Sequence, residues 1–110
     1  MARTKFHTLT EQMFYILLSL KEECCGMDIM DKVKTMTDGR VVVGSGTLYN
    51  LLEQFLEVDM IRETRVEGRR RSYVLTEKGM ETLKGEHQRL LMQISDYEKT
   101  FKGEEYEKVC

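Results

Sequence analysis

The sequence lacks the features that mark secreted and membrane-spanning proteins. It has no proline, no tryptophan and only three cysteines in 110 residues. Cys24 and Cys25 are adjacent and Cys110 is terminal, so they do not form a disulfide framework. No run reaches the roughly 18 apolar residues of a membrane span, and the first residues lack the apolar core of a signal peptide. We therefore expect a cytoplasmic protein with no membrane partner.

The sequence also lacks a constellation that would support catalysis. His7 and His87 are isolated in the sequence. No nucleophile stands beside a base, and neither a phosphate-binding glycine loop nor a pair of carboxylates in an evident pocket can be found. Cys24 and Cys25 could sense an oxidant or a thiophilic metal, but no second thiol or histidine cluster stands at ligand spacing, so we favour a packing role. We expect neither an enzyme nor a cofactor or metal site.

The composition fits one soluble domain with a single core. Hydrophobic residues make up 41% and charged residues 33%, which argues against disorder. The net charge of −2, which is an average over the whole chain, does not indicate a nucleic-acid-binding protein. Charge is segregated, however, because residues 61–71 contain five arginines against Glu63 and Glu67, a local net charge of +3. Binding to phosphate depends on such a local patch.

The stretch Gly44–Glu57 has the pattern of an amphipathic helix with an exposed start. Its apolar residues recur at the spacing of one buried stripe: Leu48, Leu51, Leu52 and Phe55. Ser45 stands between two glycines and is a suitable N-cap, so the first turn should present small side chains and free backbone N–H groups. These are properties of a groove-reading helix, although any capped surface helix shares them.

Two further helices are predicted before this stretch. Thr8 and Glu11 have capping-box spacing in front of an apolar run that ends at Leu20. Residues 26–36 repeat the helical period, with five residues expected to face the core: Met27, Ile29, Met30, Val33 and Met36. A turn at Asp38-Gly39 then leads towards the third helix. Two helices, a tight link and a third helix with small polar residues at its start are the order of a helix-turn-helix unit.

Residues 60–75 have the pattern of a β-hairpin. Met60–Val66 and Arg69–Leu75 are predicted strands, and Glu67-Gly68 is the turn between them. The arginines could simply keep the hairpin soluble. Because the hairpin directly follows a helix-turn-helix unit, we favour a wing that lays guanidinium groups on a phosphate backbone.

A long last helix is predicted from Thr76, its N-cap. Its apolar residues form a heptad seam: Met80, Leu83, His87, Leu90, Ile94, Tyr97 and Phe101, with Leu91 and Met92 beside it. A seam of this length exceeds what a three-helix core needs, so we expect a dimerisation helix. The alternative is that the helix folds back on its own domain. The charged tail after Phe101 is expected to fray.

Several motifs, spread over roughly Leu9–Phe101, resemble the PadR family of transcriptional regulators in its compact form with one C-terminal helix. The element Gly46-Thr47-Leu48-Tyr49 is followed by Tyr73-x-Leu75-Thr76-x-x-Gly79, and this combination is fairly specific. The resemblance implies a dimeric winged-helix repressor, many relatives being released from DNA by small molecules. Residues 1–75 would form the winged helix-turn-helix domain, and residues 76–110 the dimerisation helix and tail of the same structural unit.

The expected fold is therefore mainly α with a small β-hairpin. The residues predicted to bind double-stranded DNA are Ser45, Thr47, Tyr49, Asn50, Lys32, Arg69, Arg70 and Arg71. Those predicted at the homodimer interface are Met80, Leu83, His87, Leu90, Leu91, Ile94, Tyr97, Phe101 and Phe14. The chain departs from the family pattern at Met27, Asn50 and Asp59, and without tryptophan it cannot build an effector pocket on tryptophan stacking. The alternatives are a winged helix that binds protein and a regulator that responds to thiols or metals through Cys24 and Cys25.

Overall fold

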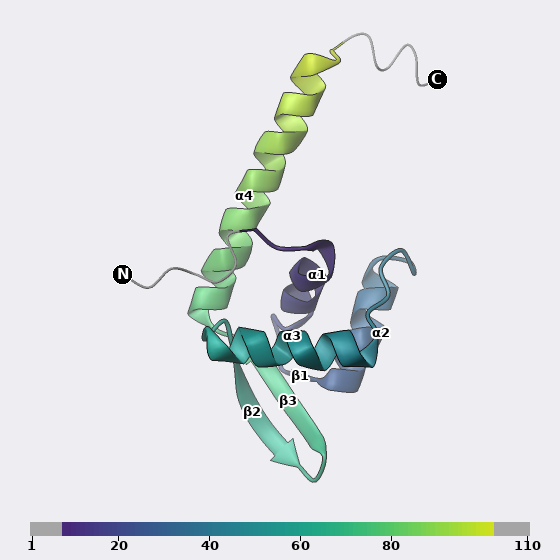
Figure 1. Cartoon of the computed structure of the whole chain (residues 1–110), viewed down its shortest axis with the longest axis vertical. Helices are drawn as coiled ribbons and strands as arrows, with labels where there is room; N and C mark the ends of the chain where they lie inside the picture. The colour runs from purple at the N-terminus through teal and green to yellow at the C-terminus, as the bar shows by residue number, and fades with distance from the viewer. Residues whose placement is uncertain (1–7, 103–110) are drawn as a thin grey trace.

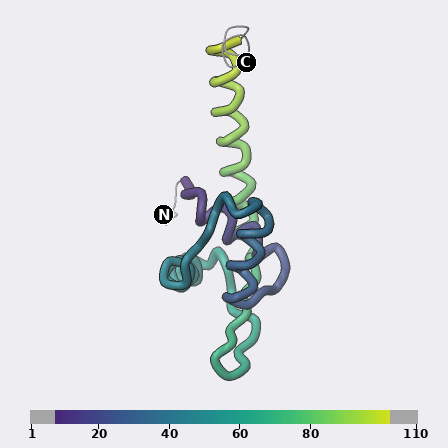
Figure 2. The backbone as a smooth tube through the Cα atoms, turned by 90° about the vertical axis from the view of Figure 1, so that its right-hand side faces the viewer, coloured from purple at the N-terminus to yellow at the C-terminus, as the bar shows by residue number. Residues whose placement is uncertain are grey.

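The computed structural model describes residues 8–102, which form four helices and three strands (Figure 1). In chain order these are α1 (Glu11–Ser19), β1 (Cys24–Cys25), α2 (Gly26–Met36), α3 (Ser45–Glu57), β2 (Ile61–Glu67), β3 (Arg70–Leu75) and α4 (Glu77–Thr100). The β2–β3 hairpin projects from one end of the body and α4 from the other (Figures 1 and 2). The predicted mainly helical fold with a wing and a long last helix is confirmed. The tail after Lys102 lies outside the described residues.

The core lies between the first three helices and the base of the sheet. The predicted stripe of α3 is fully or almost fully buried, and Phe55 is its largest member. Ile16 and Leu17 of α1 and Ile29 and Val33 of α2 join it. Burying an aliphatic or aromatic side chain contributes about 1.5–3 kcal/mol, so this shared cluster fixes the position of α3.

Two helices begin at caps other than the predicted ones. Thr10, not Thr8, is the N-cap of α1, and its hydroxyl accepts a hydrogen bond from the Met13 N–H at 3.2 Å. The cap is shifted because Leu9 is already buried in the core before the helix starts. Gly44, not Ser45, is the N-cap of α3, which leaves Ser45 as the first helical residue.

The predicted inward face of α2 is only partly correct. Ile29 and Val33 are buried and Met30 is partly buried, but Met27 is 71% exposed and Met36 47% exposed. The place expected for Met36 is taken by Thr37, whose hydroxyl donates to the Val33 carbonyl at 2.8 Å and accepts from the Val41 N–H at 3.0 Å. Met27 lies on the opposite side of the helix from this buried stripe.

The sheet has a third strand that the sequence did not reveal. Its order is β1-β3-β2, and the two cysteines of β1 pair with Tyr73 and Ser72 of β3. A two-residue strand is too short to show the alternation on which sequence prediction depends. The hairpin itself is confirmed, with its tip one residue later than expected, and Gly68 adopts a positive φ of 64° there.

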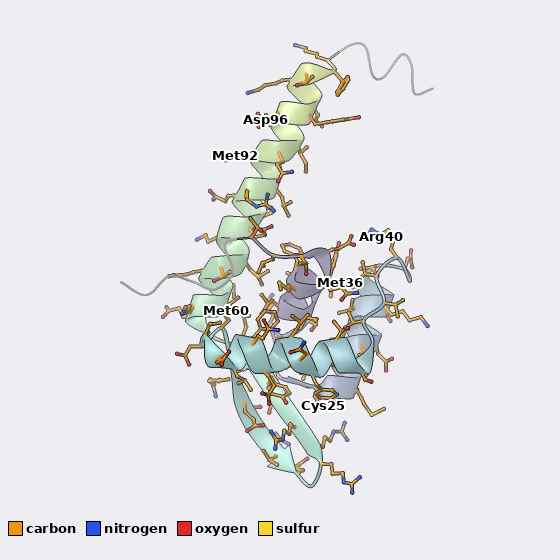
Figure 3. The ribbon with its side chains drawn as sticks, viewed as in Figure 1. Cys25, Met36, Arg40, Met60, Met92 and Asp96 are labelled. Carbon is orange, nitrogen blue, oxygen red and sulfur yellow. The ribbon has the colours of Figure 1, made fainter. Side chains whose placement is uncertain are left out.

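The start of α4 is fixed to the end of α3 by close backbone contacts. Thr76 caps the helix as predicted, its hydroxyl accepting from the Gly79 N–H at 3.1 Å. The Thr76 N–H donates to the Met60 carbonyl at 3.0 Å, and its hydroxyl donates to the Asp59 carbonyl at 2.6 Å. Met60 lies where α3, the hairpin and α4 meet (Figure 3). The direction of α4 is therefore set at its first turn.

The second half of α4 projects away from the body (Figure 1). Leu83 is buried in the core, and Glu86 is 5% exposed and pairs with Arg89. Beyond these residues the apolar side chains of the helix are exposed or only partly covered, including Met92 (Figure 3). No helix within residues 8–102 is long and apolar enough to cross a membrane.

Candidate nucleic-acid interface

The outer face of α3 presents the side chains that were predicted to approach DNA. Ser45, Thr47, Tyr49 and Asn50 are all exposed, while the opposite stripe of the helix lies in the core. The Gln54 amide donates to Asn50 Oδ1 at 3.3 Å, which steadies the Asn50 carboxamide along the helix. The arrangement directs polar side chains outward from a rigid helix, as reading a groove requires.

The first turn of α3 is open to an external anion. No side chain in the described part of the chain caps its start at Gly44. Residues 44–47 are all exposed, and a Cβ added at Gly44 or Gly46 would meet no described atom within 4 Å. The first N–H groups of a helix have no intrahelical partner, and the helix dipole favours negative charge beside them. A phosphate group could therefore approach this turn closely.

Tyr49 is held against the start of α2 by a glycine. A Cβ added at Gly26 would overlap the Tyr49 hydroxyl and would lie 2.8 Å from Cζ of the ring. Gly26 is buried, and Tyr49 is 45% exposed. The glycine thus leaves room for the ring, which covers the first turn of α2 on one side and faces solvent on the other.

The wing places three consecutive arginines, Arg69, Arg70 and Arg71, around its tip and along β3. All three are exposed. Several of the hairpin's arginines are nevertheless engaged by carboxylates: Arg65 by Glu23 and Glu67, Arg70 by Asp28, and Arg71 by Glu63, at N···O distances of 3.5 to 3.9 Å. Exposed pairs of this kind contribute about 0–1 kcal/mol, so the arginines can exchange partners.

A hollow between α2, α3 and the wing brings the predicted residues together. It has a volume of about 440 Å³ and is lined by Cys25, Gly26, Met27, Asp28, Asp31, Tyr49, Arg69, Arg70 and Arg71. A second hollow of about 230 Å³ lies on the α3 side, where Arg69 and Arg71 face Tyr49, Glu53 and the buried Tyr73. An aromatic ring, three guanidinium groups and the start of a helix therefore border one continuous face.

Sequence reasoning did not assign five members of this hollow to the interface, namely Cys25, Gly26, Met27, Asp28 and Asp31. For the last three the signal was available, because residues 27, 28 and 31 share the face of α2 that the buried stripe at 29, 33 and 37 leaves outside. Lys32 does not line the hollow. Its ammonium group donates to the Ser19 carbonyl at 3.4 Å and so joins α2 to the end of α1.

Cys24 and Cys25 are buried side by side in β1, where α2 meets the hairpin; Cys25 is labelled in Figure 3. Burial is the main cause that raises the pKa of the Cys24 thiol, with the charge of Lys32 acting in the opposite direction. A protonated thiol is a poor nucleophile and metal ligand. Within residues 8–102, no group of three or more His, Cys, Asp or Glu side chains could hold a metal ion.

The seam of α4 forms a second exposed face, which is apolar. Ile94, Leu91, Tyr97 and Phe101 are 41–52% exposed, and the rings of Tyr97 and Phe101 lie 5.2 Å apart. Nearer the body, a hollow of about 440 Å³ between α1 and α4 is lined by Phe14, Leu18, Met80, Leu83, Lys84 and His87. Leu90 is half-buried and His87 exposed, whereas Leu83 packs into the core of its own chain.

Solved structures share this fold. A transcriptional regulator from Clostridium thermocellum aligns with a TM-score of 0.69 at 20% identity, over 81% of this chain and 90% of that one. A PadR family transcriptional regulator from Eggerthella lenta DSM 2243 gives 0.69 at 18% identity, over 84% and 82%. A PadR family transcription regulator from Clostridium difficile R20291 gives 0.62 at 21% identity, over 83% and 98%.

These distant structural similarities show the fold, and a family model shows the family. No curated protein matches the chain. The model of the transcriptional regulator PadR-like family matches residues 16–85, from α1 through the wing into α4. Since this match covers more than half of the sequence, the chain belongs to the PadR-like family of transcriptional regulators.

Proposed function

We propose that the protein is a sequence-specific repressor that binds double-stranded DNA as a homodimer. The observation that carries this proposal is the shared face on which Tyr49 of α3 meets Arg69, Arg70 and Arg71 of the wing. Two copies of α3 would enter successive major grooves about 34 Å apart on a pseudo-palindromic operator.

Different side chains would position the protein and read the sequence. Thr47 and Asn50 reach base edges, and the carboxamide of Asn50 suits the donor and acceptor pair of adenine. Ser45 and the open first turn of α3 bind a phosphate, and the wing arginines follow the backbone. Tyr49, whose ring packs against Gly26, lies between these two phosphate contacts and sets how closely the DNA backbone approaches.

The dimer would form through the apolar face of α4. Its exposed seam and the hollow beside Phe14 leave a long apolar surface that a second copy covers. Leu83 belongs to the core of its own protomer and also lines this hollow, so it contributes to the dimer interface from inside the protomer. The same hollow, at about 440 Å³, is large enough for a small-molecule effector that releases the protein from DNA.

The proposal is tested by fluorescence anisotropy with the DNA upstream of the protein's own gene at two salt concentrations. We expect tight, sequence-selective binding that weakens steeply with salt. Replacing both Arg69 and Arg71 by Ala should weaken binding to every sequence and make the slope of log K against log [salt] shallower by about 0.9 for each lost phosphate contact.

The matched control replaces Lys78 and Lys99 of α4 by Ala, which gives the same change in net charge on another part of the molecule. This variant should keep the slope of the wild type. Equal slopes for the two variants would contradict the assignment of the wing, and an absence of salt-dependent DNA binding by the wild type would favour a winged helix that binds protein.

A further inference from the structure

Of the three consecutive wing arginines, Arg70 is the one that pairs with a carboxylate of α2 among the described residues. Its Nη2 lies 3.9 Å from Asp28 Oδ2 on α2. A hydrogen bond with the Cys25 side chain, and then the charges of Cys25 and Asp28, raise the pKa of the Arg70 guanidinium. The ion pair with Asp28 therefore holds this side chain towards the body.

The neighbouring arginines provide an internal comparison. Arg71 pairs with Glu63, so both members of that ion pair belong to the hairpin itself. Arg69 borders the same hollow, and within residues 8–102 it makes no ion pair. Asp31 also lines the hollow, and likewise has no ion pair among the described residues. The Arg70–Asp28 pair is thus a specific link between the wing and α2.

The link is weak enough to be broken by an incoming phosphate. The side chains of Arg70 and Asp28 are 64% and 57% exposed, and the hollow beside them is open to solvent. An exposed ion pair of this kind is screened by solvent and salt, and it contributes little to stability. A phosphate in the hollow would take Arg70 from Asp28 and leave a free carboxylate beside a polyanion.

We propose that Asp28 is a positioning residue that competes with DNA phosphates for Arg70 and thereby limits the sequence-independent affinity of the protein. The inference rests on the proposed function, since it requires the wing to contact DNA. Each binding event frees Asp28, which then attracts a cation from solution. This cation uptake offsets part of the counterion release that drives association.

The test is Asp28→Asn, measured by anisotropy on the upstream duplex and on a scrambled duplex of the same length and composition. Because a phosphate contact carries no sequence information, binding to both duplexes should tighten by about two- to fivefold. The slope of log K against log [salt] should become steeper by up to about 0.9, since no carboxylate is freed. A purely structural role for Asp28 would not steepen this slope.

Asp31→Asn is the matched control, with the same charge change on the same helix and in the same hollow. It should change affinity less than Asp28→Asn and leave the slope as in the wild type. The effect of Asp28→Asn should disappear in an Arg70→Ala background and persist in an Arg69→Ala background.

Two results would overturn the inference while leaving the proposed function intact. In the first, the wild type binds DNA but the Asp28→Asn variant binds it with equal or weaker affinity. The other is a gain that survives in the Arg70→Ala background, because the effect would then be general electrostatics. A wild type without salt-dependent DNA binding would overturn both proposals.

Discussion

Two glycines of α4 should respond in opposite directions to the same substitution. A Cβ added at Gly79 would overlap the Met60 carbonyl oxygen and would lie 3.1 Å from the Met60 carbonyl carbon. That oxygen accepts the Thr76 N–H, so it cannot withdraw without weakening the bond that starts the helix. At Gly85, no described atom lies within 4 Å of an added Cβ.

These contacts give the expected magnitudes. Alanine in a helix interior gains about 1 kcal/mol over glycine, so Gly85→Ala should stabilise the protein by 0.5 to about 1 kcal/mol. At Gly79, overpacking costs about 1–3 kcal/mol and the strained Thr76 bond about 1 kcal/mol more. After the gain in helix propensity, Gly79→Ala should lower the free energy of unfolding by about 1–3 kcal/mol.

The assay is urea unfolding followed by circular dichroism. All proteins are compared at one concentration, because a dimer's stability depends on concentration. Opposite shifts of the midpoint, with unchanged slope of the transition, are expected. If Gly79→Ala is as stable as Gly85→Ala, then the backbone contact between α4 and Met60 does not exist in solution and does not set the direction of α4.

Three further perturbations have defined outcomes. Gly26→Ala should displace the Tyr49 ring, which is 45% exposed and can swing away, so DNA affinity should fall in anisotropy titrations while the unfolding midpoint changes little. Ile94→Asp should yield monomers in analytical ultracentrifugation if α4 dimerises, because it places charge on an exposed apolar face without touching the core; a persisting dimer would place the interface elsewhere. The hydrogen bond from Arg89 lowers the pKa of Glu86, so ionised Glu86 adds stability at pH values above its unfolded pKa of about 4.3, and this is lost as the pH falls through its folded pKa. Glu86→Gln should therefore destabilise the protein by only about 1 kcal/mol at pH 7, because Arg89 is partly exposed. In urea titrations, the difference in stability between the variant and the wild type should shrink below about pH 4.

Local patterns were sufficient to predict the elements that carry the candidate interface. The stripe of α3, the hairpin and the Thr76 cap each depend on residues close together in the sequence, and each is confirmed. The match to the PadR-like family confirms the resemblance and the prediction of a regulator rather than an enzyme.

The parts that escaped prediction depend on contacts between distant segments. β1 exists only because β3 lies beside it, and Met36 is displaced from the core by Thr37, which bonds to the following loop. The pairing of Asp28 with Arg70 joins residues far apart in the chain, so no local pattern could reveal it. Asp59 adopts a positive φ of 63°, a backbone conformation that favours glycine.

The short strand β1 has a mechanical consequence for DNA recognition. Its pairing with Tyr73 and Ser72, together with the hydrogen bond from the Leu75 N–H to the Leu20 carbonyl at 2.8 Å, joins the hairpin to the helices at its base. These contacts fix the position of the base of the wing relative to the helices. Under the proposed function, it is the duplex that has to adjust its groove width to this arrangement. Base steps that the protein never touches would then influence binding through the flexibility of the DNA itself.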